Sequence, residues 1–303
     1  MNLLDLSNPR NPFTWIQNSE LSPPPAGVIF PEFYNAIMGW RVPIAIIALY
    51  VTVVETANSR VKVEKLSRVV ASSKGVDAKA KSNSSPMFTS FIILHNAALC
   101  IYSAWTFYHS ASALRANFAS NGFWDAFCDK SHNYWNGALG LYGYYFYLSK
   151  YWEILDTIII LLKGRRSSLL QTYHHSGAIL TMWAGINYSS YPIWIFVVFN
   201  SLIHTIMYFY YAVATMGYNP PFKQNLTQLQ ITQFVTGQIL GLFYLAATPK
   251  GCIEEKGGRM TVWWVLIYSL PLLWLFVQFA RRSYGGVSSK GKASAGKENG
   301  KKE

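Results

Sequence analysis

The sequence predicts an all-α membrane protein with seven transmembrane helices. Hydrophobic residues make up 51% of the 303 residues and charged residues only 13%, whereas a soluble domain carries roughly 25% charged residues. The apolar residues come in blocks of about 20, the length at which a helix crosses a bilayer. We expect these helices at residues 34–54, 87–108, 138–162, 168–186, 190–214, 228–248 and 261–280.

The third predicted helix is the least clean of the seven, and the sixth is unusually rich in glutamine. Charged residues lie within the third at Lys150, Glu153 and Asp156, so this segment fits either one long helix or two short ones. The sixth contains Gln230 and Gln233, and buried amides of this kind must find hydrogen-bond partners. Both segments therefore need a polar interior to face.

The formal net charge of +12 is concentrated in three places along the chain. All three follow odd-numbered spans, so with seven spans they fall on one side of the membrane. The positive-inside rule places that side, with the C-terminus, in the cytosol and the N-terminus in the lumen. We therefore expect a protein of the lipid bilayer that binds no nucleic acid. The basic residues are Arg60, Lys62, Lys65, Arg68, Lys74, Lys79 and Lys81, then Lys163, Arg165 and Arg166, then Arg281, Arg282 and the lysines that follow.

The predicted domain organisation is simple. Residues 1–284 are expected to form a single membrane domain that includes a lumenal segment at 1–33. The first thirty residues show no charged region followed by an apolar core, so the first span is expected to act as the insertion signal. Residues 285–303 are rich in Gly, Ser and Lys, a composition typical of a disordered tail.

The three cysteines are separated by the predicted topology. Cys100 lies within the second span, where a cysteine is typically a small buried apolar residue. Cys128 and Cys252 lie in two loops on the lumenal side, where disulfides persist. We therefore predict a Cys128–Cys252 disulfide, the alternative being two free thiols.

Polar side chains recur at helical spacing in the third span. Lys150, Glu153 and Asp156 are three residues apart, and Thr157 follows Glu153 by four, so they share one side of a helix. Ionisable residues within a membrane face a polar interior or one another. Taken alone, the pattern is as typical of a structural ion-pair cluster as of a catalytic site.

The next two spans carry three of the six histidines. Gln171, His174 and His175 occupy positions i, i+3 and i+4 of one helix face. In the following span Asn200 precedes His204 by four residues, a spacing at which the amide could orient the imidazole. Tyr208 and Tyr211 continue the same helix. Four successive spans with polar faces indicate an enclosed polar chamber.

The histidines suit two kinds of chemistry. Imidazole binds iron or zinc, so a three-histidine zinc site of His174, His175 and His204 is conceivable, although no carboxylate or cysteine box accompanies it. Imidazole also acts as an acid, base or nucleophile near pH 7. No cysteine lies on the polar faces, which argues against a condensing mechanism based on a thiol.

Taken in chain order, these residues resemble the four signature motifs of the fatty-acid elongase family. The resemblance covers about residues 35–280, and the four motifs together are far more specific than any one. The matching segments are Lys150-x-x-Glu153-x-x-Asp156-Thr157, Gln171-x-x-His174-His175, Asn200-x-x-x-His204-x-x-Met207-Tyr208 and Thr227-Gln228-x-Gln230-x-x-Gln233.

The resemblance implies a microsomal 3-oxoacyl-CoA synthase without a bound cofactor or metal. Such an enzyme joins a long acyl-CoA to malonyl-CoA with release of CO₂ and CoA, inside a narrow tunnel of seven helices. The tunnel is open to the cytosol, where CoA phosphates would meet Lys163, Arg165 and Arg166. The resemblance also implies an endoplasmic reticulum membrane location, a homodimer, and association with the reductases and dehydratase of the elongation cycle.

The family mechanism implies an acyl-imidazole intermediate. Carried over to this sequence, it makes His174 the nucleophile, with His204, held by Asn200, as the partner that polarises the thioester or promotes decarboxylation. His175 is expected to hydrogen-bond Asp156 or Glu153. The residues expected to bind substrate are Lys150, Glu153, Asp156, Thr157, Gln171, Tyr208, Tyr211, Gln230 and Gln233, with Lys163, Arg165 and Arg166 at the mouth.

One residue departs from the family pattern. The family box usually begins with histidine, and here Gln171 takes that position. Glutamine donates and accepts hydrogen bonds but neither titrates nor becomes acylated, so it is expected to position other groups. The same variant is found in members resembling elongases of polyunsaturated or C18-type substrates, which favours such a substrate here; the alternative is an inactive member.

Two other classes of protein fit parts of the pattern. A seven-span receptor or transporter explains the helices but not a His-His pair beside Lys-x-x-Glu-x-x-Asp. A metal-dependent lipid-modifying enzyme, such as a desaturase, explains the histidines, although such enzymes need more of them than the six present. The elongase interpretation accounts for all of these features.

Overall fold

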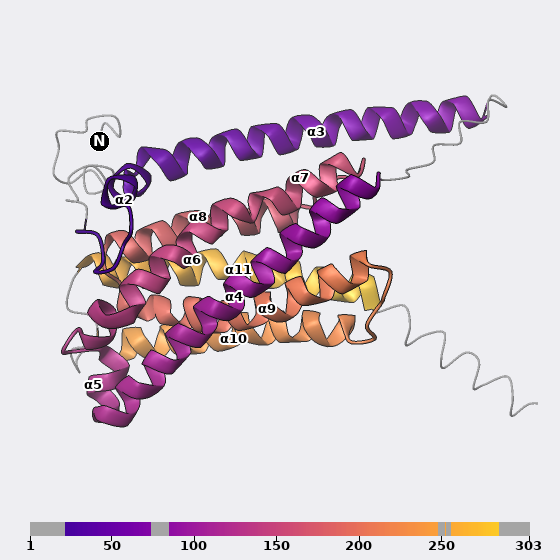
Figure 1. Ribbon diagram of the computed structural model, residues 1–303. Coiled ribbons are helices and arrows are strands. Elements are labelled where there is room, and N and C mark those ends of the chain that lie inside the picture. Colours follow the sequence, from indigo (N-terminus) through magenta and orange to yellow (C-terminus); the bar gives the residue numbers. More distant parts are fainter. Residues whose placement is uncertain (1–21, 74–84, 248–251, 253–255, 285–303) are drawn as a thin grey trace, which may run out of the picture.

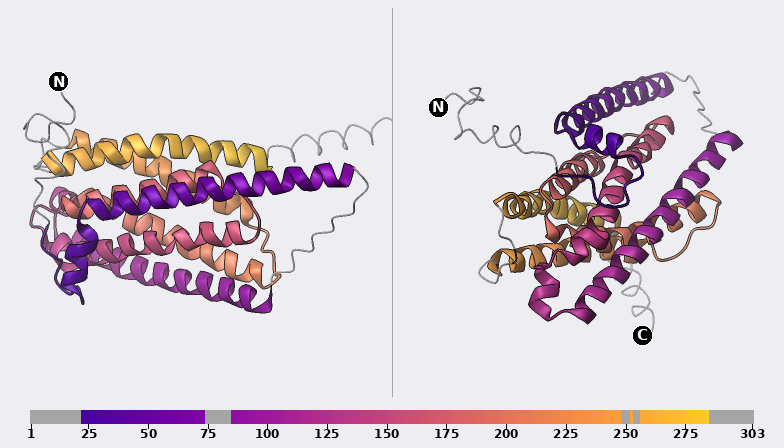
Figure 2. Two further views of the ribbon diagram at one scale, coloured as in Figure 1. Left: turned by 90° about the horizontal axis from the view of Figure 1, so that it is seen from above. Right: turned by 60° about the vertical axis from the view of Figure 1, so that its left-hand side comes forward.

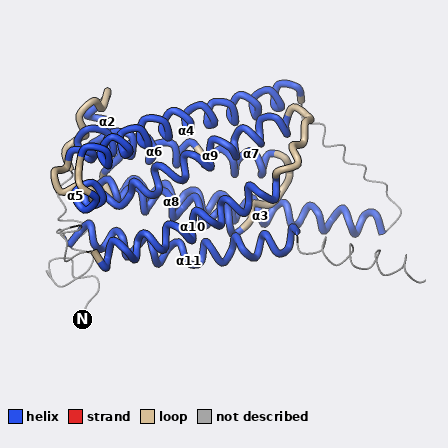
Figure 3. The backbone as a smooth tube through the Cα atoms, turned by 90° about the horizontal axis from the view of Figure 1, so that it is seen from below, coloured by secondary structure: helices blue, strands red, loops and turns tan. Residues whose placement is uncertain are grey.

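The computed structural model describes residues 22–73, 85–247, 252 and 256–284. Helices connected by short loops and turns account for these residues, and no strand occurs among them (Figure 3). The fold is therefore that of an all-α membrane protein, as predicted. In chain order the helices are α2 (Pro31–Met38), α3 (Arg41–Ser73), α4 (Pro86–Ser120), α5 (Phe123–Cys128), η1 (Trp135–Leu139), α6 (Gly140–Trp152), α7 (Ile154–Leu162), α8 (Leu169–Asn187), η2 (Tyr191–Ile193), α9 (Trp194–Thr215), α10 (Lys223–Ala246) and α11 (Lys256–Tyr284).

Five helices in the described part of the chain are long and apolar enough to cross a membrane. They are α3, α4, α9, α10 and α11, and they run along the length of the bundle in Figure 1. The third and fourth predicted spans are not among the five. The third is divided between two short helices, and the fourth is α8, whose 19 residues include the polar box at its beginning.

The lengths of α3 and α4 correct the prediction. The predicted spans 34–54 and 87–108 extend in the structure to Ser73 and Ser120. Hydropathy marks the apolar part of a helix, but lysine, glutamate and arginine are good helix formers and prolong it beyond the bilayer length. The second half of α3 continues past the other helices in the left view of Figure 2.

The helix is broken between α6 and α7. Glu153 lies between the two helices, and its amide still donates to the Ser149 carbonyl at 2.8 Å. The Ser149 hydroxyl shares its one proton between the Phe146 carbonyl at 2.8 Å and Oε1 of Glu153 at 3.2 Å. Of the two alternatives for the third predicted span, the structure shows two short helices, and the break sets Glu153 at their junction.

The helices differ in how much of their surface is buried. In α9, 67% of the apolar stretch is buried inside the bundle, against 22% in α3. α9 packs along α4, and α8 packs against α3, α6 and α11. The helices that carry His174, His175 and His204, α8 and α9, therefore lie inside the bundle, where polar side chains are removed from lipid.

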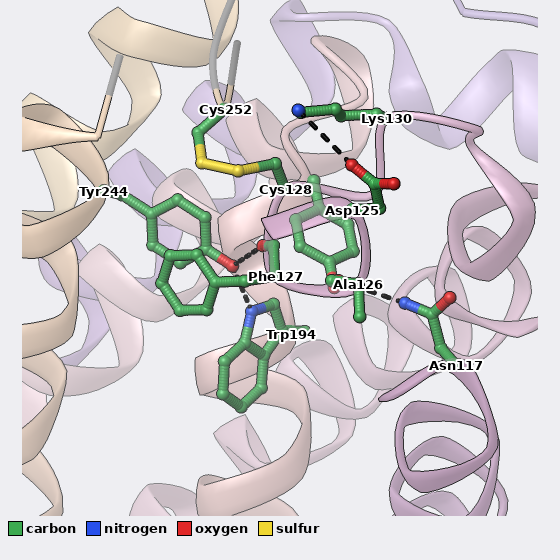
Figure 4. The surroundings of a disulfide bond; sticks show 10 residues. Asn117, Asp125, Ala126, Phe127, Cys128, Lys130, Trp194, Tyr244 and Cys252 are labelled. Carbon is green, nitrogen blue, oxygen red and sulfur yellow. Dashed lines mark hydrogen bonds and ion pairs between the residues drawn. A yellow bond between two sulfur atoms is a disulfide. The ribbon is translucent and has the colours of Figure 1, made fainter. Parts of the chain in front are cut away.

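A disulfide closes one end of the bundle (Figure 4). Cys128 at the end of α5 is joined to Cys252, with their Cα atoms 4.3 Å apart, which confirms the predicted pairing. Beside it, Trp194 Nε1 donates to the Tyr244 hydroxyl at 2.7 Å, and that hydroxyl donates to the Phe127 carbonyl at 2.5 Å. These bonds connect α5, α9 and α10 at the same end.

The predicted basic residues that the structure describes gather at the opposite end. The loop after α7 and the end of α11, with Arg281 and Arg282 in its last turn, lie far from α5 in Figure 1. The C-terminal half of α3 points the same way. Lys74, Lys79, Lys81 and the tail 285–303 lie outside the described residues, as does most of the predicted lumenal segment.

Candidate active site

A cavity of about 810 Å³ lies among α4, α7, α8, α9, α10 and α11. It is lined by both polar and apolar side chains that are far apart in the sequence. Three predicted site residues, Lys150, Thr157 and Arg166, do not line it. The predicted residues that do are Glu153, Asp156, Lys163, Arg165, Gln171, His174, His175, Asn200, His204, Tyr208, Tyr211, Gln230 and Gln233.

Lys150 lies behind the cavity wall, where only 2% of its side chain is exposed. Its Nζ donates to Oε1 of Glu153 at 2.7 Å and to Oδ1 of Asn200 at 3.1 Å, and it lies 3.8 Å from the centre of the Phe146 ring. A buried charge is tolerated only when it is paired in this way. Asn200 therefore bonds to Lys150, and the expected bond between Asn200 and His204 is absent.

The three histidine rings form one side of the cavity. The ring centre of His174 is 5.2 Å from that of His175 and 6.4 Å from that of His204. His204 Nδ1 is 3.4 Å from Oε1 of Glu153, an ion-pair distance without hydrogen-bond alignment. Oε2 of Glu153 has no hydrogen-bond partner among the described residues. A carboxylate and three imidazoles thus meet at one cavity.

Asp156 receives hydrogen bonds from two residues on different helices. Its Oδ1 lies 2.8 Å from His95 Nε2, and its Oδ2 accepts from the Tyr208 hydroxyl at 2.7 Å. The hydrogen bond expected from His175 to Asp156 or Glu153 is not formed: other side chains bond to both Asp156 oxygens, and His175 Nδ1 is buried without a partner among the described residues. His175 instead places its ring edge against Tyr50, with ring centres 6.3 Å apart.

Gln171 is bound to the cavity wall through Thr157. Gln171 Nε2 donates to Oγ1 of Thr157 at 3.0 Å, and this hydroxyl also pairs with the Tyr50 hydroxyl at 2.9 Å. Thr157 is fully buried. Gln171 thus connects α8 to α7 and, through Thr157, to α3; its positioning role in the reaction stays a prediction.

The loop from α7 to α8 brings two cations to the cavity. Lys163 and Arg165 line it, and burial together with the nearby Arg165 lowers the pKa of Lys163. The loop ends at Ser168, whose hydroxyl caps α8 by accepting from the Gln171 amide at 3.2 Å. Two cations and the beginning of a helix suit an anionic group at this end.

The backbone around His174 is held by α11. The Tyr268 hydroxyl donates to the His174 carbonyl at 2.9 Å, and the Tyr173 hydroxyl donates to the Tyr268 carbonyl at 3.1 Å. Gly177 permits this contact, because a Cβ there would lie only 1.9 Å from the Tyr268 ring. The histidine-bearing turn of α8 is therefore attached to α11 on one side and, through Gln171, to α7 on another.

The face of α10 that lines the cavity is rich in glutamine in the sequence, but these glutamines make few polar contacts in the structure. Gln230 Nε2 lies 3.5 Å from the Met207 sulfur, and Gln233 is buried. Phe234 packs on Phe276 of α11 with ring centres 5.2 Å apart. This face changes from amides to aromatic rings within one turn, so the cavity has an apolar side as well as a polar one.

The histidines are not arranged as metal ligands. Within the described ranges, no three His, Cys, Asp or Glu side chains come together in a group that could hold a metal ion. The conceivable zinc site of His174, His175 and His204 is therefore not formed. What the site offers is paired imidazoles with adjacent carboxylates, which suits proton transfer and nucleophilic attack.

The most important residue without a role in the sequence interpretation is His95. It lies within a predicted span, and an intramembrane histidine is itself a signal of function, but no motif connects it to Asp156. Asn58 was missed for a similar reason, since its partner Ser167 is 109 residues away. Contacts between distant helices leave no spacing pattern in the sequence.

The bundle and its cavity define a multi-pass membrane protein with a histidine and carboxylate site between its helices. A sequence model of the ELO family, described as the GNS1/SUR4 family, matches residues 36–294. The chain belongs to this family.

Named relatives in other organisms are similar over much of the chain. Fatty acid elongase 1 of Trypanosoma brucei brucei is 28% identical over 235 residues, which is 74% of this chain and 75% of that protein. Long chain fatty acid elongase 2 of Caenorhabditis elegans is 28% identical over 206 residues, or 64% and 72%. Fatty acid elongase sre1 of Dictyostelium discoideum is 32% identical over 164 residues, or 54% and 61%. The chain spans 61–65% of the length of two Dictyostelium relatives.

Proposed function

We propose that this protein is the condensing enzyme of fatty-acid elongation. It joins a long-chain acyl-CoA to malonyl-CoA and releases a 3-oxoacyl-CoA, CO₂ and CoA. The observation that carries the proposal is the pair of imidazoles, His174 and His204, whose ring centres lie 6.4 Å apart in a cavity that no cysteine lines. Relatives named fatty acid elongase and long chain fatty acid elongase support it.

The first half of the reaction forms an acyl-enzyme. A ring nitrogen of His174 attacks the thioester carbon of the acyl-CoA, the carbon–sulfur bond breaks, and CoA leaves as the thiolate, which takes up a proton. His174 suits this role because its ring lies in the cavity and its backbone is held by Tyr268. An imidazole is a nucleophile at neutral pH, and the acyl-imidazole that forms remains reactive.

The second half uses the acyl-imidazole. Malonyl-CoA loses CO₂, and the electron pair of the broken bond forms a carbanion beside the thioester. The carbanion attacks the acyl carbon, the bond to His174 breaks, and 3-oxoacyl-CoA forms. In this proposal His204, whose Nδ1 lies 3.4 Å from Oε1 of Glu153, acts as the proton donor to the developing thioester enolate.

The two ends of the substrate meet different surroundings. Lys163 and Arg165 suit the CoA phosphates, because both carry donors that match phosphate oxygens. Phe234 and Phe276 suit the acyl chain. The proposal includes an endoplasmic reticulum membrane location with the N-terminus lumenal, no bound cofactor, a homodimer, and the reductases and dehydratase of the cycle as partners.

The test is the intact mass of the purified protein after incubation with a long-chain acyl-CoA alone. We expect a mass increase equal to one acyl group in the wild type and none in His174→Ala. The acyl-enzyme should disappear when malonyl-CoA is added, as 3-oxoacyl-CoA is formed.

The matched control is His109→Ala. His109 stacks on Tyr142 with ring centres 4.9 Å apart and does not line the cavity, so its loss should leave the adduct in place. An acyl group that remains in His174→Ala would exclude His174 as the nucleophile. Product formation without any adduct would exclude the covalent route, and neither product nor adduct with any chain length would indicate an inactive protein.

A further inference from the structure

His95 takes part in a chain of hydrogen bonds that joins three helices. Its Nε2 lies 2.8 Å from Oδ1 of Asp156, and Oδ2 of the same carboxylate accepts the Tyr208 hydroxyl at 2.7 Å. The three residues lie on α4, α7 and α9. Asp156 and Tyr208 line the cavity, whereas His95 does not. The histidine therefore reaches the site only through the carboxylate.

The surroundings of His95 keep lipid and water away from it. Only 2% of its side chain is exposed. The ring stacks on Phe91 with ring centres 6.2 Å apart and meets the edge of Trp152 at 6.3 Å. A polar side chain is expensive in such a place, so its hydrogen bond to Asp156 contributes more than the same bond would in water.

The directions of the two hydrogen bonds follow from their partners. An ionised carboxylate only accepts, so the proton of the His95 ring is on Nε2. The other ring nitrogen, Nδ1, is buried and has no hydrogen-bond partner among the described residues. The Tyr208 hydroxyl likewise donates to Asp156. Both bonds fix the rotation of the carboxylate, and the carboxylate in turn fixes the direction of the tyrosine hydroxyl.

This chain of hydrogen bonds leads to His204, one of the two histidines to which the proposed mechanism assigns a role. The Tyr208 ring meets the His204 ring edge-on, with ring centres 5.5 Å apart and planes at 86°. No ring contact joins His174 to Tyr208 among the described residues. We propose that His95 is a positioning residue for the second half of the reaction, in which it holds Asp156 and Tyr208 so that His204 is correctly placed to promote decarboxylation and condensation. This inference rests on the function proposed above.

A purely structural role makes a different prediction. If His95 only joined α4 to α7, its loss would loosen the bundle and slow both halves of the reaction together. A positioning role through Tyr208 slows the step that depends on His204 and leaves attack by His174 intact. The ratio of the two rates therefore separates the alternatives.

The experiment measures the two half-reactions separately in the full-length protein. Acyl-enzyme formation is followed by intact mass with acyl-CoA alone, and its discharge is followed after malonyl-CoA is added. In His95→Leu we expect formation within about threefold of wild type and discharge slowed by about tenfold or more, since 1.4 kcal/mol, a typical loss for one such hydrogen bond, is a factor of ten. In His95→Gln, whose Nε2 can replace the ring donor, discharge should return to within about threefold.

Three controls make the result decisive. His109→Gln, on the same helix, should leave both rates unchanged. Tyr208→Phe keeps the ring but loses the hydroxyl, so it should show the same selective loss even if His95→Leu does not fold. Equal slowing of both steps in His95→Leu, or an unchanged discharge rate in Tyr208→Phe, would overturn the proposal. Absence of an adduct in the wild type would instead contradict the proposed function.

Discussion

The side-chain amide of Asn58 makes both of its hydrogen bonds with the backbone of a single residue, Ser167. Its Oδ1 accepts from the Ser167 amide at 2.8 Å, and its Nδ2 donates to the Ser167 carbonyl at 3.2 Å. Both residues are buried. The outer helix α3 thereby holds the end of the loop that carries Lys163 and Arg165, so the cations at the cavity depend on a helix that contributes no residue to its lining.

Replacing Asn58 by alanine should weaken the binding of both CoA substrates. Two buried hydrogen bonds disappear, and the loop end is no longer fixed, at a cost of roughly 1–3 kcal/mol. We expect the KM for acyl-CoA and for malonyl-CoA to rise about three- to tenfold, with a smaller change in kcat. Steady-state kinetics of Asn58→Ala in detergent micelles measure this.

The control for this change lies on the same helix. Thr52 is exposed, and its hydroxyl bonds only to the Ala48 carbonyl one turn before it, at 2.8 Å. Thr52→Ala should leave both KM values unchanged. A kcat that falls while the KM values stay constant in Asn58→Ala would mean that the loop does not hold the substrates.

Removing only the charge of Lys150 should destabilise the protein more than removing the charges of both Lys150 and Glu153. Lys150→Met leaves the Glu153 carboxylate buried without its cation, a change that typically costs 3–5 kcal/mol. The double change Lys150→Met with Glu153→Gln removes both charges and should recover part of the loss. Thermal unfolding of the purified protein orders the three forms, and a double variant less stable than Lys150→Met would contradict this.

The disulfide should contribute stability but not catalysis. Loss of a cross-link over 124 residues typically lowers the free energy of unfolding by about 2–4 kcal/mol. Cys128→Ser with Cys252→Ser should therefore lower the Tm, and a reducing agent should have the same effect on the wild type. Activity below the Tm should change little, because the cavity is not lined by either cysteine.

Cys100 provides the comparison. It is the free cysteine of the described chain, so Cys100→Ser should leave the sensitivity to reducing agent intact. A Tm that falls in the double serine variant no more than in Cys100→Ser would show that the bridge is energetically unimportant.

Phe234 should limit the length of the acyl chain. It and Gln233 line both the main cavity and a second one of about 20 Å³, which lies beyond them among α9, α10 and α11. Phe234→Ala should join the two cavities and extend the product distribution by about two to four carbons, since each buried CH₂ contributes about 0.8 kcal/mol. Product analysis with a series of acyl-CoA lengths measures this.

Gly237 allows the opposite change. It lines the second cavity, where the nearest atom to an added Cβ is Ile195 Cγ2 at 3.9 Å, so a larger side chain has room to fill the space. Gly237→Leu combined with Phe234→Ala should restore the shorter products. Phe243→Ala, on the same helix but outside both cavities, should keep the wild-type distribution; if it lengthens the products equally, Phe234 has no special part.

Gln171 should be replaceable by histidine but not by alanine. Its function in the structure is the hydrogen bond that Nε2 donates to Thr157 at 3.0 Å. Gln171→Ala should lower kcat/KM about tenfold, the equivalent of 1.4 kcal/mol. Gln171→His, which restores a ring N–H donor, should remain within about threefold of wild type. Equal losses in both variants would mean that the shape of the glutamine matters more than its donor.

The sequence was sufficient for the membrane class, the disulfide and most of the polar residues that line the cavity. Spacing of three and four placed Gln171, His174 and His175 on one face, because helical geometry alone determines it. It could not say which partners those faces would meet. Asn200 and His204 are one turn apart in the same helix, yet Asn200 bonds to Lys150. Pairings between helices depend on packing, which no local pattern encodes.

The predicted ends of two spans were wrong, again because a local sequence pattern does not contain the information. Hydropathy reports the apolar part of a helix, so the continuation of α3 to Ser73 and of α4 to Ser120 was not predicted. The break at Glu153 was foreseen only as one of two alternatives, since a charge within a span indicates either a buried pair or an end. In the structure Glu153 lies at the end of a helix and also belongs to a buried ion pair with Lys150.

The attachment of His174 to α11 has a consequence for the order of events. The Tyr268 hydroxyl donates to the His174 carbonyl, and Gly177, which has no side chain, lets α8 and α11 pack closely together. Under the proposed chemistry, the acceptor of the acyl group therefore stays at a fixed position, and the acyl donor and the malonyl donor have to reach it one after the other. The first CoA then has to leave before the second enters. The two CoA molecules therefore occupy the site in turn, while His174 stays in place.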